Sequence, residues 1–157
     1  MQTSVIFATS HGTTQKVAEK IREHIGETNC AIYNLKDNPS IDLSNYQRVI
    51  IGGSIYAGTM QKKVKEFCNA NIEKLTEKRL GLFICGMNEP AFEEELKNAF
   101  PEKLLEHASS KKAVGGEFVM DKLNFFEKLI VKKVSGVKES VSKLDFDKIR
   151  QLVSETE

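Results

Sequence analysis

Near its amino end the chain reads Val5-Ile6-Phe7-Ala8-Thr9-Ser10-His11-Gly12-Thr13-Thr14-Gln15-Lys16-Val17-Ala18-Glu19-Lys20-Ile21. The apolar beginning predicts a buried strand, the middle a turn rich in hydroxyl groups, and the end an amphipathic helix. Such a turn presents unpaired backbone N–H groups at the start of the helix, where the helix dipole also favours negative charge. This order of elements predicts a phosphate site.

The composition of the turn narrows the ligand. Gly12 lets the backbone approach a ligand closely, and four hydroxyl groups lie around it, those of Thr9, Ser10, Thr13 and Thr14. The turn lacks the Gly-Lys-Ser/Thr step of nucleoside triphosphate loops and the three glycines of dinucleotide turns. A turn without charged side chains suits a terminal monophosphate. A plain helix cap remains the alternative for the same residues.

The pattern Thr-Ser-His-Gly-Thr-Thr directly after the first strand resembles the FMN phosphate loop of flavodoxins, whose usual form is Thr/Ser-x-Thr-Gly-x-Thr. His11 departs from the pattern, because it stands where that family generally has a hydroxyl residue. A neutral imidazole can still donate one hydrogen bond. The resemblance implies FMN as the cofactor, with its phosphate on Thr9, Ser10, His11, Gly12, Thr13 and Thr14.

Size and composition set limits on the protein class. The 157 residues are enough for one well-buried core, so we expect one domain over residues 1–157. No apolar run has the length of a membrane span and no signal region precedes the first strand, which predicts a cytoplasmic protein. The balance of 23 basic and 22 acidic residues argues against nucleic acid as a partner. Three scattered cysteines predict buried apolar positions and no metal site.

Apolar runs predict four more strands, over Cys30–Leu35, Arg48–Gly53, Leu80–Cys85 and Lys112–Val119. Helical spacing follows the first strand and recurs from about Met60, through Phe92 to Ala99, briefly after Pro101, and over Phe146 to Val153. Strands that alternate with helices form a parallel sheet through right-handed crossovers. The predicted fold class is therefore α/β: a flavodoxin-like three-layer sandwich with a five-stranded parallel sheet in the order 2-1-3-4-5 and helices on both faces.

In such a sheet a ligand lies beyond the carboxyl ends of the strands, at the switch point between strands one and three. The loop at Ser54–Thr59 and the loop at Gly86–Pro90 should therefore lie beside the Thr9–Thr14 turn. Tyr56 can stack on a flavin ring, although an ordinary loop aromatic remains the alternative. The expected ring-binding residues are Ser54, Ile55, Tyr56, Ala57, Gly58, Cys85, Gly86, Met87 and Asn88. No catalytic side chain is predicted, because a flavin carries electrons itself.

The segment Asp121–Gly136 exceeds what a five-stranded fold of this kind needs. Apolar residues at helical spacing predict an extra amphipathic helix over about residues 122–135, with lysines along its rim. A helix packed on the body of the protein is the favoured interpretation. The alternative is contact with a membrane surface, a quinone or a partner through Leu123–Val134.

Two stretches, Val49–Gly58 and Phe126–Gly136, resemble the flavodoxin-domain group that includes the menaquinone-dependent protoporphyrinogen IX dehydrogenases. The resemblance implies FMN and transfer of electrons from protoporphyrinogen to a quinone. The chain departs from that group after Met87, where those enzymes carry a longer basic insertion. Here Asn88-Glu89-Pro90 leads directly into an acidic helix. The fold and the cofactor are thus better supported by the resemblance than the substrate is.

The sequence therefore predicts an FMN-binding flavodoxin-like electron-transfer protein that acts with a redox partner protein or a quinone. The alternative is a quinone-linked protoporphyrinogen IX dehydrogenase or a related FMN-dependent oxidoreductase, peripheral at the inner face of the membrane. A third hypothesis is a flavin-free signalling module of the response-regulator type. The stretch Ala8-Thr9-Ser10 disfavours it, because Mg²⁺ and phosphate transfer would require acidic residues there.

Overall fold

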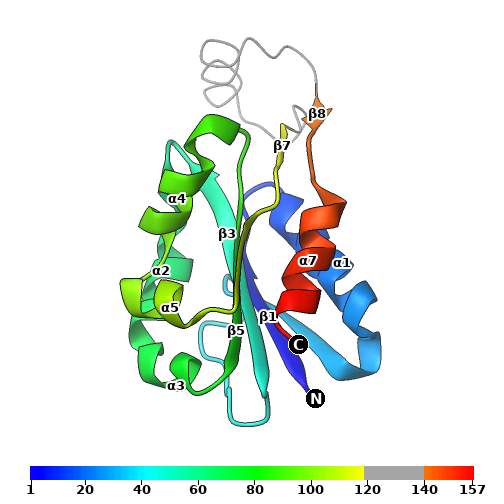
Figure 1. Ribbon diagram of the computed structural model, residues 1–157, viewed down its shortest axis with the longest axis vertical. Helices are drawn as coiled ribbons and strands as arrows, with labels where there is room; N and C mark the ends of the chain where they lie inside the picture. Colours follow the sequence, from blue (N-terminus) through cyan, green and yellow to red (C-terminus); the bar gives the residue numbers. More distant parts are fainter. Residues whose placement is uncertain (119–139) are drawn as a thin grey trace.

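The computed structural model describes residues 1–118 and 140–157 and places five parallel strands in one central sheet (Figure 1). Across the sheet the strands are β2 (Cys30–Asn34), β1 (Thr3–Ala8), β3 (Arg48–Tyr56), β5 (Arg79–Cys85) and β6 (Ser110–Ala113). Counted along the chain, this is the predicted order 2-1-3-4-5. The predicted fold class is confirmed.

Helices cover both faces of the sheet (Figure 1). One face carries α1 (Thr13–Ile25) and α7 (Phe146–Glu155). The other face carries α2 (Lys62–Ala70), α3 (Ile72–Thr76), α4 (Phe92–Ala99) and α5 (Glu102–His107). Short 3-10 turns, η1 (Glu27–Asn29) and η2 (Glu89–Ala91), lead into β2 and α4. Gly26 ends α1 at a φ of 104°, and Pro101 separates α4 from α5, as the sequence predicted.

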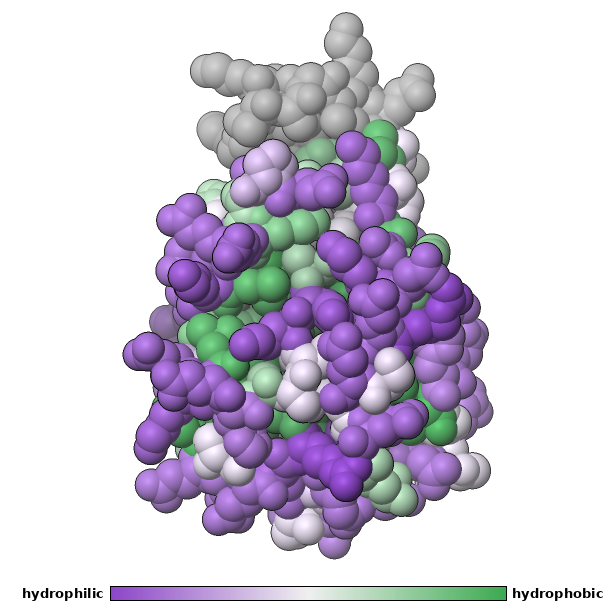
Figure 2. Space-filling model, in the orientation of Figure 1, coloured by the Kyte–Doolittle hydropathy of each residue, from purple (hydrophilic) through white to green (hydrophobic). Residues whose placement is uncertain are grey.

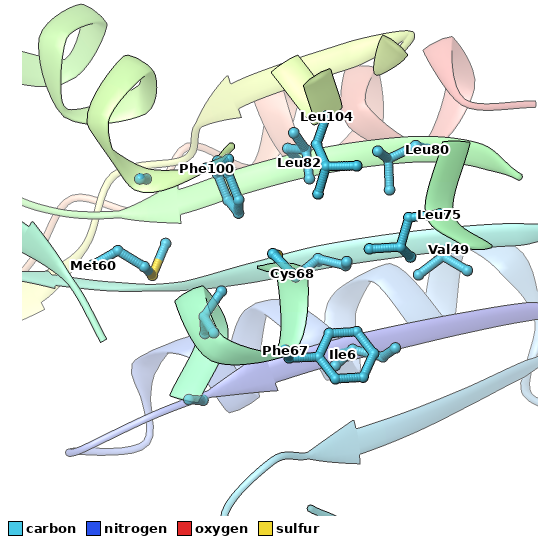
Figure 3. Close-up of a cluster of buried hydrophobic side chains, with 14 of the residues drawn as sticks. Ile6, Val49, Met60, Phe67, Cys68, Leu75, Leu80, Leu82, Phe100 and Leu104 are labelled. Atoms are coloured by element: carbon cyan, nitrogen blue, oxygen red, sulfur yellow. The ribbon is translucent and has the colours of Figure 1, made fainter. Parts of the chain in front are cut away.

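Alternating residues of each central strand fill two separate cores. In β1, Val5 and Phe7 pack beneath α1 and α7, whereas Ile6 packs on the opposite face. Figure 3 shows that second core, where Ile6, Val49 and Leu82 from the sheet meet side chains of the covering helices. Both faces of the sheet are buried, which explains why its three central strands, β1, β3 and β5, are mainly apolar. All three cysteines are free and buried, as predicted.

The third strand is longer than predicted. The sequence placed a loop over Ser54–Thr59, but β3 continues to Tyr56 and pairs with a short antiparallel strand, β4 (Thr59–Met60). Ala57 and Gly58 form the turn between them with φ values of 49° and 77°. Two successive positive φ values match the twist of a tight hairpin. The following helix consequently begins at Lys62 rather than Met60.

The fifth strand is shorter than predicted. It ends at Ala113 instead of Val119, and the chain turns at Gly115, where φ is 80°. Glu117–Phe118 (β7) then pairs antiparallel with Val141–Ser142 (β8) in a separate two-stranded sheet. Any side chain at position 115 would collide with the carbonyl group of Lys143, so only glycine fits this turn. The predicted helix over residues 122–135, including Leu123–Val134, lies outside the described residues.

The surface is mainly polar over the face drawn in Figure 2, where hydrophobic groups lie between hydrophilic side chains. Among the described residues, the large hydrophobic side chains exposed to solvent are Met1, Tyr56 and Phe146. Within the same residues, no helix combines the length and the apolar character needed to cross a bilayer.

Gly52 should be essential for the packing of β3 against β5. A Cβ atom at this position would lie 2.3 Å from the ring of Phe83, which is itself fully buried. We expect Gly52→Ala to lower the free energy of unfolding by about 3 kcal/mol, measured by urea denaturation. Gly86→Ala is the control, because its Cβ would meet no atom closer than 3.6 Å. Equal stability losses in the two variants would contradict this account.

Candidate functional site

The predicted phosphate turn joins β1 directly to α1. Gly12 adopts a left-handed conformation with φ 89° and ψ −7°, and its N–H donates to Thr9 Oγ1 at 2.9 Å. No side chain caps the start of α1, and its first turn contains no acidic residue. The first amides of the helix therefore stay available to an anion. This backbone geometry fits the predicted site better than a plain side-chain cap, which would use those amides.

The three predicted loops meet at the carboxyl ends of the strands. Thr14 Oγ1 lies 2.7 Å from Ser54 Oγ, and the Thr14 hydroxyl is close enough to Cys85 to act on the pKa of its thiol. Ser54 and Cys85 are register partners in the β3–β5 pair. The turn after β1 is thus hydrogen-bonded to the end of β3 and lies beside the end of β5.

Gln61 makes a second connection, which sequence reasoning missed. Its amide oxygen accepts from Ser54 N at 3.2 Å, and its Nε2 donates to Ser10 Oγ at 2.9 Å. Gln61 directly precedes α2, and nothing in its sequence context signals this role. The side chain therefore holds the phosphate turn against the end of β3.

Hydrogen bonding inside the turn preserves donors for a ligand. Thr9 Oγ1 accepts from Gly12 N and Ser10 Oγ accepts from Gln61, so each hydroxyl keeps its own proton to donate. Thr14 and Ser54 share one hydrogen bond, which uses only one of their two hydroxyl protons. These hydroxyl groups can therefore still donate hydrogen bonds to a phosphate.

The β3–β4 hairpin places Tyr56 beside this region with 55% of its surface exposed. Ala57 holds a positive φ that an L-residue adopts at a cost of about 1 kcal/mol. Added at Gly58, a Cβ would meet no atom within 4 Å, so the hairpin tip faces open space. An exposed aromatic ring on a tight hairpin can form one wall of a site for a planar ligand.

The loop after β5 is packed against the chain that follows β6. Gly86 N donates to Gly115 O at 2.9 Å, and a Cβ atom on Gly116 would lie only 2.9 Å from the Gly86 carbonyl oxygen. A hollow of about 300 Å³ adjoins this loop, and its lining includes Gly86, Met87, Lys143 and Lys148. Asn88 is exposed and precedes η2. The backbone here can approach a ligand closely.

Cys85 does not have the environment of a reactive thiol. Burial raises the pKa of Cys85 to about 12, although the hydrogen bond with Thr14 acts in the opposite direction. Its thiolate form is therefore scarce at neutral pH. The geometry favours a packing role, in agreement with the buried apolar position that the sequence predicted for each cysteine.

Glu117 contacts the phosphate turn, and the sequence analysis did not include it. Its carboxylate accepts from Thr13 Oγ1 at 3.1 Å and pairs with Lys16 Nζ at 3.0 Å. Burial alone would raise the pKa of Glu117, but hydrogen bonds from Lys16, Ser142 and Thr13 outweigh burial and lower it. The contact joins β7 to α1. No local pattern predicts it, because Glu117 reaches the turn only through the hairpin with β8.

The profile of the flavodoxin domain family matches residues 4–145. The chain belongs to that family. A comparison with curated proteins gave no significant match. Among solved structures, a short-chain flavodoxin associated with a non-canonical PDU bacterial microcompartment is 16% identical, with a TM-score of 0.56 over 99% of this chain and 97% of the other. Oxidised flavodoxin 2 from Bacillus cereus is 14% identical, with a TM-score of 0.54 and the same coverage.

A larger protein contains the same fold as one part. Rubredoxin oxygen:oxidoreductase from Desulfovibrio gigas is 14% identical, with a TM-score of 0.58 over 99% of this chain. This chain spans only 34% of that protein's length. At these identities the solved structures support the flavodoxin fold alone.

A second hollow in this flavodoxin-family chain lies elsewhere. It has a volume of about 680 Å³ at the amino ends of the strands, and its lining includes Tyr46, Arg79, His107 and Glu155. Ligands of doubly wound sheets bind at the opposite, carboxyl edge. We therefore locate the candidate site at the hydrogen-bonded loops and not at this hollow.

The lowered pKa of Glu117 predicts a pH-dependent contribution to stability. Ionised Glu117 stabilises the fold above the carboxyl's usual pKa of 4.5, and this contribution is lost as pH falls through the lower folded-state pKa. Glu117→Gln should therefore reduce the free energy of unfolding by about 1 kcal/mol at pH 7 and by less at pH 3, measured in urea. Glu19→Gln, on the exposed side of α1, is the control. A difference from wild type that is the same at both pH values would refute the assignment.

Proposed function

We propose that this chain binds FMN and transfers electrons with a redox partner. The observation that carries the proposal is the hydroxyl-rich Thr9–Thr14 turn, which opens α1, is hydrogen-bonded to the end of β3 and lies beside the end of β5 in a member of the flavodoxin domain family. These are the loops at the switch point of the sheet, where such folds bind their ligands. The turn has no charged side chain, a composition that suits a monophosphate better than a polyphosphate with its metal ion.

In this proposal the first amides of α1 and the hydroxyl groups of Thr9, Ser10 and Thr14 hold the phosphate. Gly12 fits the task because its left-handed conformation turns the backbone sharply at the start of the helix. His11 is included in the site on the basis of its position in the turn. The main energetic contribution comes from oriented backbone dipoles, so no lysine or arginine is needed within the turn itself.

The ring would lie between the hairpin residues 54–58 and the loop residues 85–88. Tyr56 offers an aromatic wall, and Gly86, Met87 and Asn88 offer backbone groups to the polar edge of the ring. When bound, FMN supplies the electron-carrying chemistry. The chain would position the ring, exclude water from part of it and set its reduction potential through hydrogen bonds and burial.

A more specific function, quinone-linked oxidation of protoporphyrinogen IX, is a second proposal. It rests on the resemblance of Val49–Gly58 and Phe126–Gly136 to the enzymes that carry out this reaction. It includes peripheral membrane contact through Leu123–Val134. A flotation assay with vesicles containing anionic lipid at low salt tests it. Full-length protein that stays unbound, and reduced flavin that menaquinone fails to oxidise, would contradict it.

The first test is the visible absorption spectrum of the purified chain after incubation with excess FMN and removal of free flavin. We expect a retained flavin band, with menaquinone and protoporphyrinogen tried next as acceptor and donor. A colourless protein would refute the proposal. The Thr9–Thr14 turn would then be a helix cap on a flavin-free module.

Thr14→Val should weaken FMN binding by roughly tenfold, because a hydroxyl that can donate to a charged phosphate is lost. Binding is measured by quenching of flavin fluorescence. Thr76→Val is the matched control, since its hydroxyl donates to Glu73 O on the distant helix α3. Circular dichroism checks that both variants are folded. Unchanged affinity in a folded Thr14→Val variant would contradict the phosphate assignment.

A further inference from the structure

Glu117 places a negative charge beside the start of α1. The first turn of α1 contains no acidic residue, yet β7 places a carboxylate 3.1 Å from Thr13 Oγ1. The Glu117 side chain is 9% exposed and Lys16 is 54% exposed, so the carboxylate is the more buried member of the ion pair. A buried charge is weakly screened and acts strongly on its neighbours.

We propose that Glu117 is a specificity-determining residue of the flavin site, one that weakens the preference for phosphorylated over unphosphorylated flavins. This inference rests on the proposed binding of FMN at the Thr9–Thr14 turn. Glu117 acts against a phosphate in three ways, through the Thr13 hydroxyl, through the Lys16 ammonium group and through its own charge.

The Thr13 hydroxyl has one proton, and in this structure it donates that proton to Glu117. It cannot donate the same proton to a phosphate. Lys16 Nζ lies 3.0 Å from Oε1 and 3.3 Å from Oε2 of Glu117, so both carboxylate oxygens hold the ammonium group. Lys16 is the first cation after the turn in the sequence. Glu117 therefore engages two groups that would otherwise favour a phosphate.

The carboxylate also repels a phosphate directly, because its lowered pKa keeps it ionised at neutral pH. Both Glu117 and the flavin phosphate are then anions at the same end of α1. Riboflavin has the same ring as FMN and no phosphate, so none of these three effects applies to it. The ratio of the binding affinities of FMN and riboflavin therefore isolates the contribution of Glu117 to phosphate recognition.

A purely structural role for Glu117 would give a different result. Glu117 joins β7 to α1, and the adjacent Gly116 packs on the carbonyl of Gly86 in the proposed ring loop. If the contact served only to hold this loop, removing it would loosen the ring site. Both flavins would then bind more weakly, and by similar factors.

The experiment compares the dissociation constants of FMN and riboflavin for wild type, Glu117→Gln and Glu155→Gln by flavin fluorescence. Glutamine keeps the size of the side chain and can still accept from Thr13. Glu155 is the matched control, because its carboxylate likewise accepts from a hydroxyl, Ser110 Oγ at 2.7 Å, and pairs with Lys112 at 3.1 Å. It lies at the amino ends of the strands, away from the site.

In Glu117→Gln we expect FMN to bind about tenfold more tightly, which is the effect of one partly buried charge, with riboflavin affinity within about twofold of wild type. The gain should shrink at high salt. Adding Lys16→Gln to this variant should remove much of the gain, because the released ammonium group would be lost. Glu155→Gln should leave both affinities unchanged.

Two results would overturn the inference while FMN binding by wild type stands. One is an unchanged ratio of the two affinities in Glu117→Gln, and the other is an equal loss of affinity for both flavins. Wild type that binds neither flavin would overturn the proposed function, and this inference with it. Thermal unfolding of each variant identifies any general loss of folded protein.

Discussion

The central constraint is that both faces of the sheet are covered, so that β1, β3 up to Gly53 and β5 from Leu80 are buried. Every residue of β1 is buried, and successive side chains enter two different cores. Each parallel strand must therefore be followed by a connection that covers one face or the other, which produces the three layers. The close approach of Gly52 to the ring of Phe83 shows how little space remains between these strands. The same constraint brings the carboxyl ends of the strands, and the loops that leave them, to one edge.

The candidate site uses the sheet as its support. Ser54 is still part of β3, and its register partner Cys85 ends β5, so both are positioned by the sheet ladder. Thr14 contacts these two residues from α1, and Gln61 links Ser10 to Ser54. The turn is thus fixed by polar contacts to rigid elements, while several of its hydroxyl and amide hydrogen-bond donors remain available to a ligand. A site built in this way loses little conformational entropy when a ligand binds.

Local sequence pattern was sufficient for the succession of strands and helices, for the turn between β1 and α1, and for the ends of α1 and α4, whereas the strand order came from the likeness to flavodoxin-like sheets. These features depend on residues close in the chain, such as Gly26 and Pro101, and on the general rules of parallel sheets. Local sequence pattern did not predict the pairing of strands that lie far apart in the chain. Nothing in Glu117–Phe118 indicates that its partner is Val141–Ser142, and the apolar run over Lys112–Val119 concealed the turn at Gly115. The roles of Gln61 and Glu117 depend on such distant contacts.

The small β7–β8 ribbon has a consequence for how the fold tolerates a change in chain length. Phe118 and Val141 are register partners, so the two points at which the chain leaves and re-enters the described structure are held side by side. Closing a longer connection costs little, about 0.6 kcal/mol for each doubling of its length. The ribbon therefore lets the length of the intervening segment change at little cost to the sheet and to the turn after β1.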